Sequence, residues 1–148
     1  MLFDTLQKQK DLYKAKQVAI QIKAGEAWIA FMKGRKTDAL NLMSVAADME
    51  DSTSKHPVTP GEVLPARELY ADMLLQMQQN ENALQAYEKV LQKSPNRFNS
   101  LYGPGIAAVK MDFIDKAFSY YKQLVIMANP NSNRPELSVA RAFLNKHS

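Results

Sequence analysis

The clearest hydrophobic pattern lies between residues 64 and 97, where it predicts two short helices joined by a polar turn. In the second of these helices the apolar side chains follow the spacing i, i+3, i+4, i+7 and i+8, which places them on one helical face. These side chains are Ala83, Ala86, Tyr87, Val90 and Leu91. Asn80 and Asn82 are candidate caps for this helix. Pro95 ends it, because proline cannot continue the backbone hydrogen bonds.

The same spacing occurs again both later and earlier in the chain. Ala83 and Tyr87 correspond to Ala117 and Tyr121 in a later unit, and Ala83 corresponds to Ala39 in an earlier one. The step to the later unit is about 34 residues, a period typical of two-helix units that stack into a helical-repeat protein. The units cover residues 20–51, 64–97 and 98–131. The step from the first unit to the second is longer because of an insertion loop at residues 52–63.

These units resemble the tetratricopeptide repeat (TPR). The TPR motif has a small residue in its first helix, an alanine early in its second, an aromatic residue four positions later and a closing proline. The middle unit supplies Ala71, Ala83, Tyr87 and Pro95. The third supplies Gly105, Ala117 and Tyr121, whereas the first supplies Ala27 and Ala39 but has Met43 at the aromatic position and no proline. The resemblance implies an all-α fold, a right-handed αα superhelix of about three TPR-like helix pairs.

A further helix is predicted at each end of the repeats. Residues 10–33 read mostly as one helix that ends at Gly34, and residues 1–9 as a frayed or partly docked start. A capping helix is expected at about residues 134–146. We therefore expect residues 1–148 to form a single TPR-like domain. Its first unit is atypical, so the chain can also be the C-terminal part of a longer protein.

The helix predicted after residue 98 is weak by intrinsic propensity. It contains Gly103, Pro104 and Gly105, and glycine and proline are the poorest helix formers. We expect packing within the repeats to hold this segment in a helix.

The insertion loop contains His56, in the run Lys55-His56-Pro57-Val58-Thr59-Pro60-Gly61. This run and the Leu-Pro-Ala-Arg-Glu that follows resemble a loop in the C-terminal repeat region of uncharacterised bacterial TPR proteins, which makes the loop a family trait. His56 is a candidate for contacting a ligand or acting as a general base. The alternative is that the loop packs over the bend between two repeats.

Composition and charge exclude several classes of protein. The chain has no cysteine, no apolar run long enough for a membrane span and no signal-peptide core near its start. We therefore expect a cytoplasmic protein without a membrane partner, unless an upstream signal lies outside this sequence. Through Lys36 there are eight basic and three acidic residues. No arginine–aromatic interleaving accompanies these lysines, so we interpret them as a solvated face and expect no nucleic-acid partner.

No catalytic pattern is present in the sequence. The two histidines, His56 and His147, are far apart, and the chain has neither a glycine-rich phosphate loop nor a metal-ligand spacing. We therefore expect that the protein is not an enzyme and that it binds no metal and no cofactor.

The resemblance places the first helix of each unit on an inner, concave surface. The candidate groove residues at these positions are Trp28, Phe31, Glu68, Asp72, Gln76, Asn99, Tyr102, Ile106 and Lys110. Trp28 and Tyr102 are of the types that often dominate binding energy. We interpret the chain as a module that binds a protein or peptide. The alternative is a structural or oligomerisation segment, in which Trp28 and Phe31 pack against a second copy or the rest of a larger chain.

Overall fold

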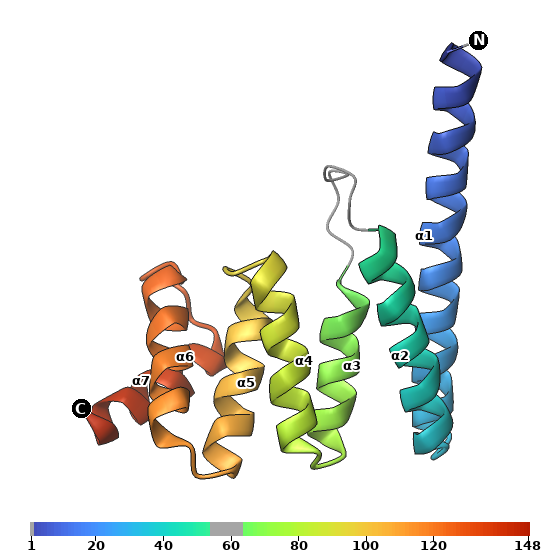
Figure 1. Ribbon diagram of the computed structural model, residues 1–148. Helices are drawn as coiled ribbons and strands as arrows, with labels where there is room; N and C mark the ends of the chain where they lie inside the picture. Colours follow the sequence, from blue (N-terminus) through green and yellow to red (C-terminus); the bar gives the residue numbers. More distant parts are fainter. Residues whose placement is uncertain (1, 54–63) are drawn as a thin grey trace. The chain divides into compact units, whose positions relative to one another are not determined.

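All the regular secondary structure is helical in residues 2–53 and 64–148, which are the residues that the computed structural model describes (Figure 1). The helices are α1 (Leu2–Met32), α2 (Lys36–Thr53), α3 (Ala66–Gln76), α4 (Asn80–Lys93), α5 (Phe98–Lys110), α6 (Ile114–Met127) and α7 (Pro135–His147). The predicted all-α fold is confirmed. The loop that contains His56 lies outside the described residues.

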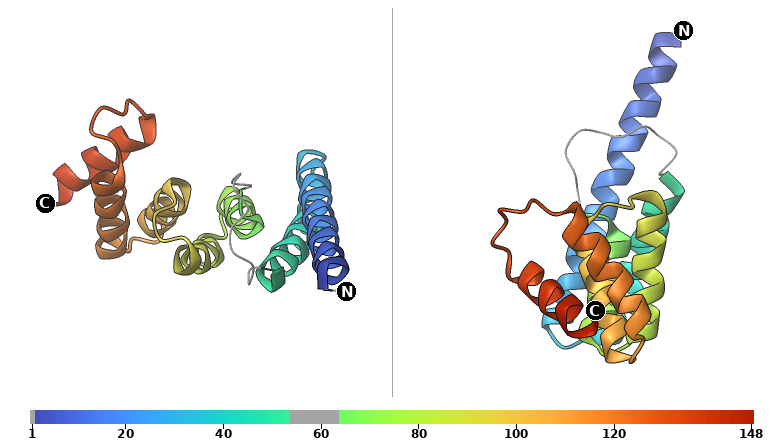
Figure 2. Two further views of the ribbon diagram at one scale, coloured as in Figure 1. Left: turned by 90° about the horizontal axis from the view of Figure 1, so that it is seen from above. Right: turned by 90° about the vertical axis from the view of Figure 1, so that its left-hand side faces the viewer.

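The chain divides into two compact units, Met1–Tyr70 and Ala71–Ser148, with the boundary inside α3. In the first unit, α1 packs against α2. In the second unit, α4 packs against α5, α5 against α6 and α6 against α7, so each helix covers the next one in sequence (Figure 2). The single domain expected from the sequence stays a prediction.

Three turns between helices share one hydrogen-bond pattern, centred on Gly34, Gln78 and Asp112. Each of these residues has a positive φ, of 82°, 61° and 61°. The N–H of each central residue donates to the carbonyl three positions before it. The N–H of the next residue donates to the carbonyl five positions before that next residue. The N···O distances of these bonds are 2.8–3.1 Å. This double pattern is the Schellman motif, which satisfies the last carbonyls of a helix. The steps between the three centres are the same as the steps between the sequence repeats.

The helix after each of these turns begins in the same way. The backbone N–H groups of Ala39, Ala83 and Ala117 bond to the carbonyl of the residue that follows the turn centre, at 2.9–3.0 Å. All three alanines are fully buried, at 0% exposure. The expected caps at Asn80 and Asn82 are wrong. Gln79 occupies the N-cap position of α4 without a side-chain cap bond, because the turn itself fixes where the helix starts.

Two tyrosine rings from neighbouring helices lie directly against two glycines of α5. A Cβ atom on Gly103 would come within 2.2 Å of the Tyr87 ring of α4, and one on Gly105 within 2.3 Å of the Tyr121 ring of α6. Positions two residues apart on a helix point about 200° apart, so the glycines receive the rings on opposite sides. Both tyrosines are buried, at 1% and 2% exposure, so the apolar face on which the spacing places Tyr87 is the buried face of α4. Packing therefore holds α5 in a helix despite its two glycines and Pro104.

Helix α1 extends well past the end of α2 within the first unit (Figure 1). It is helical from Leu2, so of the frayed or partly docked start that was expected, the frayed alternative is wrong for residues 2–9. Its side chains between residues 4 and 19 are exposed, apart from the half-buried Tyr13 and Gln17. Only the later part of α1 contributes to the core, through Ile20, Ala27 and Ala30.

We predict that Tyr87→Ala lowers the free energy of unfolding by roughly 3–5 kcal/mol, because truncating a large buried aromatic residue leaves a cavity. Urea denaturation of the purified chain measures this change. Tyr87→Phe keeps the ring and removes only the hydroxyl group, which donates a hydrogen bond to Asp72, so it should cost much less. Equal stability of the alanine variant and the native chain would contradict the repeat packing described here.

We predict opposite effects for two alanine substitutions at glycines inside helices. Gly103→Ala should destabilise the chain by roughly 1–3 kcal/mol, because the new methyl group overlaps the Tyr87 ring. Gly25→Ala should stabilise it by roughly 0.5–1 kcal/mol, since no atom lies within 4 Å of the new Cβ and alanine favours the helix. Thermal melts of both variants test the pair. A stabilising Gly103→Ala would contradict the close tyrosine contact.

Candidate functional site

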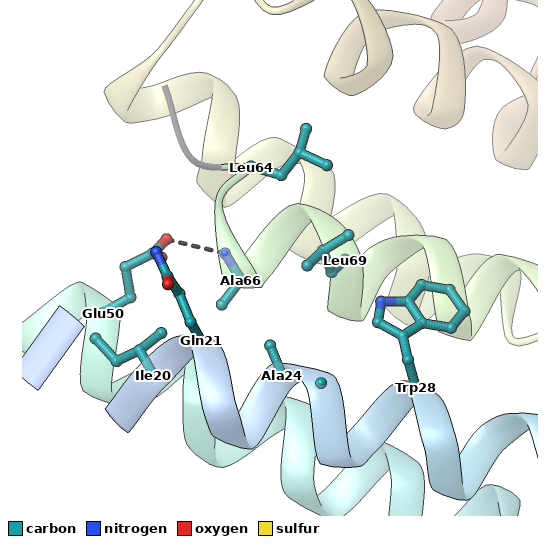
Figure 3. Close-up of a pocket in the computed structure, with 9 residues that line it drawn as sticks. Ile20, Gln21, Ala24, Trp28, Glu50, Leu64, Ala66 and Leu69 are labelled. Atoms are coloured by element: carbon teal, nitrogen blue, oxygen red, sulfur yellow. Dashed lines mark hydrogen bonds between the residues drawn. The ribbon is translucent and has the colours of Figure 1, made fainter. Parts of the chain in front are cut away.

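A hollow of about 280 Å³ lies in the first unit, between α1 and the start of α3 (Figure 3). Its lining is mostly apolar, with Gln21 and Glu50 as the polar exceptions. The lining residues are Ile20, Gln21, Ala24, Gly25, Trp28, Glu50, Leu64, Ala66 and Leu69. Of the nine candidate groove residues, Trp28 is the one that lines this hollow.

The α1 wall of the hollow follows from helical spacing. Ile20, Ala24 and Trp28 are four residues apart, so they share one face of α1. Ile20 is buried, whereas Ala24 and Trp28 are half-buried and leave surface accessible. The Trp28 ring also meets Phe31 edge-to-face, with ring centroids 5.6 Å apart and planes at 80°. This contact restrains the indole, so the hollow has a largely preformed aromatic wall.

The opposite wall is held in place by hydrogen bonds from the start of α3 to α2. The Ala66 N–H donates to Glu50 Oε1 at 2.9 Å (Figure 3). The Arg67 guanidinium donates to Asp48 and Asp51, at 2.7 Å each. Burial alone would lower the pKa of Arg67, but the hydrogen bonds to these two carboxylates outweigh it and raise the pKa. The hollow is therefore framed by fixed backbone.

Most of the side chains that build this wall were not among the site residues predicted from the sequence. Leu64 and Leu69 show as apolar positions in the sequence, but nothing in their spacing says that they line one hollow together with Trp28. Asp48 and Asp51 are three residues apart and so share a face of α2, which is a usable signal for a common basic partner. That the partner is Arg67 could not be read from the sequence.

In the second unit, several candidate groove residues bond to one another or to their neighbours. Asn99 Nδ2 donates to the Asp72 carboxylate, at 3.1 and 3.2 Å to its two oxygens, and Tyr87 donates to the same carboxylate. Lys110 Nζ lies 3.3 Å from Gln78 Oε1. The structure therefore brings Asp72 and Asn99 together. Gln76 is exposed and Ile106 is half-buried.

Glu68 does not lie on an accessible surface. Its exposure is 1%, so the expectation that it faces a partner in the groove is corrected. The assignment relied on a generic repeat pattern. Here Glu68 belongs to the first turn of α3, directly after Arg67, and this turn is packed against α2.

An aromatic row crosses the second unit. Tyr102 lies 6.1 Å from Tyr121, Tyr121 lies 5.2 Å from Phe143, and Phe143 lies 4.3 Å from His147, measured between ring centroids. Burial, and the neighbouring Tyr102, raise the pKa of Tyr121 to about 12. Burial raises the pKa of Tyr102 too, with a contribution from the negative charge of Glu136. This row joins α5, α6 and α7.

The described residues place no group of three or more His, Cys, Asp or Glu side chains where they could hold a metal ion. In residues 2–53 and 64–148, no helix has the length and apolar character needed to cross a membrane. His147 lies against Phe143 at the end of α7, with the two ring planes tilted by 38°, and extends the aromatic row.

Comparison with solved structures gives matches over nearly the whole chain. The TPR domain of Arabidopsis OM64 superposes with a TM-score of 0.70, at 14% identity over 90% of this chain and 99% of that one. A TPR-like protein of Chlorobium tepidum superposes with a TM-score of 0.63, at 14% identity over 91% of this chain and 98% of that one. The fold is TPR-like. No protein-family model matches the sequence, and no curated protein matches it.

We predict that the TPR-like second unit loses stability between about pH 10 and about pH 12. An unfolded tyrosine ionises near pH 10, whereas folded Tyr121 keeps its proton up to about 12. Over this interval the unfolded state binds fewer protons than the folded state, so unfolding becomes more favourable as the pH rises. Tyr121→Phe should reduce the loss, measured by urea denaturation across the range. Tyr13→Phe, in α1, is the matched control, and an equal effect of both variants would refute the assignment.

Proposed function

We propose that this chain is a non-catalytic protein-interaction module and that the hollow beside Trp28 receives an apolar side chain of a peptide or protein partner. The observation that supports this most directly is the hollow itself. A half-buried tryptophan lines a mostly apolar cavity, and the backbone around this cavity is held by hydrogen bonds. Sites of this kind usually combine apolar walls with a few polar groups that orient the ligand.

The chemistry of the walls favours a large aliphatic or aromatic anchor. Ile20, Ala24, Leu64 and Leu69 offer no hydrogen-bond partner to a polar side chain. Gln21, at the edge of the hollow, has an amide group that can bond to the backbone of an extended peptide. Tryptophan is enriched among residues that dominate binding energy, because its large ring loses much water-exposed area on contact.

The remaining candidate groove residues form a second part of this proposal. These residues, which are half-buried or exposed in the second unit, are Asp72, Gln76, Asn99, Tyr102, Ile106 and Lys110. The hydrogen bond between Asn99 and Asp72 holds these two side chains in fixed positions, as a recognition surface requires. Phe31 supports Trp28 through their ring contact rather than lining the hollow.

The test begins with peptides selected from a random displayed library on the native chain. Trp28 is the only tryptophan, so its emission reports on the hollow directly. We expect selected peptides to carry an aromatic or large aliphatic anchor, to shift the Trp28 emission and to bind Trp28→Ala about tenfold or more weakly. Circular dichroism first establishes that the variant is folded.

Two controls locate the binding surface. Leu6→Ala removes an exposed apolar side chain of α1 away from the hollow and should leave the affinity unchanged. A double variant, Tyr102→Ala with Ile106→Ala, tests the second unit. Peptides that bind Trp28→Ala as tightly as the native chain, without changing Trp28 emission, would refute the role of the hollow. Loss of binding in the double variant alone would assign recognition to the second unit.

A further inference from the structure

Helix α1 carries an exposed apolar stripe on a face that no described residue covers. Val18, Ile22, Ile29 and Met32 are 54%, 57%, 55% and 85% exposed. With Ala15 and Gly25, which are also exposed, they form a continuous line of small and apolar residues. Isolated exposed apolar side chains are common, but a contiguous row of them marks an interaction surface.

The spacing of this stripe is that of a coiled-coil seam. Its positions alternate steps of three and four residues, which is the a and d pattern of a heptad repeat. Ala15, Ile22 and Ile29 occupy a positions, and Val18, Gly25 and Met32 occupy d positions. The buried residues of α1, which are Ile20, Ala27 and Ala30, lie off the seam, so the seam stays exposed while the first unit is folded.

Gly25, in the middle of the seam, leaves a space that nothing in the described structure fills. A glycine inside a helix costs roughly 0.5–1 kcal/mol relative to alanine. At Gly103 and Gly105 the space accommodates a tyrosine ring, whereas a Cβ on Gly25 would meet no atom within 4 Å. The seam therefore has a hole at its centre, of a size that a neighbouring side chain can enter.

The repeat register shows what the equivalent face does later in the chain. Gly25 corresponds to Gly103 through the same two steps that relate Ala39 to Ala117. On α5 this face includes Ser100 and Ala107, both buried, and Gly103 receives the Tyr87 ring of α4. The seam of α1 is thus the repeat equivalent of the face of α5 that packs against α4. On α1 no described helix occupies it.

We propose that the seam of α1 is a self-association surface, on which the α1 helices of two copies of this chain pair antiparallel. The seam is self-complementary in that orientation, as a two-fold interface requires. Ile22 of one copy lies opposite Gly25 of the other, Val18 opposite Ile29, and Ala15 opposite Met32. Each layer pairs an a position with a d position, and two of the three pair a large side chain with a small one.

A parallel pair would place each residue opposite itself. Gly25 would then face Gly25 and leave a void, while Met32 would face Met32 and Ile22 would face Ile22. Voids and crowded layers both reduce packing energy. The antiparallel pair fills the hole at each Gly25 with an isoleucine, so the geometry of the seam selects this orientation.

This surface adjoins the peptide hollow of the proposed function, and the two share Gly25. Ile22 and Ile29 do not line the hollow, so variants at these positions test self-association without altering its walls. The two proposals can therefore fail independently.

Sedimentation velocity over a wide concentration range tests the proposal on the full chain. We expect a concentration-dependent dimer. Ile22→Glu and Ile29→Glu should each raise its dissociation constant by about tenfold or more, because a charge would enter a desolvated seam. Leu6→Glu, at an exposed position off the seam, is the matched control and should leave the constant unchanged. A chain that stays monomeric at every concentration would overturn the proposal and leave the seam to a helix of another protein.

Gly25→Leu separates the interface from the stability of the monomer. Leucine favours the helix and its Cβ meets no atom within 4 Å in one copy, but its side chain fills the hole that Ile22 of the second copy needs. We expect an equal or higher melting temperature for the monomer together with loss of the dimer. A dimer that persists in Gly25→Leu would contradict the pairing of Ile22 with Gly25.

The absence of cysteine from the chain allows the orientation to be tested by disulfide trapping. Val18→Cys and Ile29→Cys proteins are oxidised separately and as a mixture. Antiparallel pairing predicts a disulfide between position 18 of one copy and position 29 of the other, hence cross-linking in the mixture alone. Cross-linking of each variant with itself would show parallel pairing and overturn the proposed orientation.

Discussion

The second unit depends on how closely α5 approaches the helices on either side of it. Two glycines with no side chain, on nearly opposite sides of α5, each receive a tyrosine ring from a neighbouring helix. The rings fill the space that would otherwise separate the backbones, so packing supplies what the helix propensity of this segment lacks. The hydroxyl group of Tyr87 also donates to Asp72, which joins α3 and α4 to the same arrangement.

The turns provide the second constraint, because they fix where each pair of helices begins and ends. In all three Schellman turns the central residue has a positive φ, although two of the three residues are not glycine. A glutamine or an aspartate in this conformation is strained, so the surrounding packing must hold it there. The buried alanine at the start of each following helix is the complementary feature, since it lets the two helices approach directly after the turn.

The fold could be predicted from the sequence because its determinants are local and repeated. The spacing of Ala39, Ala83 and Ala117, the aromatic Tyr87 and Tyr121, and the breaks at Gly34 and Pro95 gave the all-α repeat and most helix limits. The hollow could not be predicted in the same way, because its walls meet through tertiary packing. Arg67 bonds to Asp48, which is 19 residues away, and that contact helps to place α3. The burial of Glu68 and the empty space at Gly25 depend on which neighbour is present, and the periodicity of one helix does not contain that information.

The glycine–tyrosine contacts also restrict how this protein can change during evolution. Tyr87 with Gly103, and Tyr121 with Gly105, form two linked pairs whose members come from different helices. A larger residue at either glycine overlaps a ring, whereas a smaller residue at either tyrosine leaves only a cavity. The order of substitutions is therefore constrained, because the tyrosine must be replaced by a smaller residue before the glycine can be replaced by a larger one. Related chains should accordingly show covariation between these positions, with a bulkier residue in α5 accompanied by a smaller one in the facing helix.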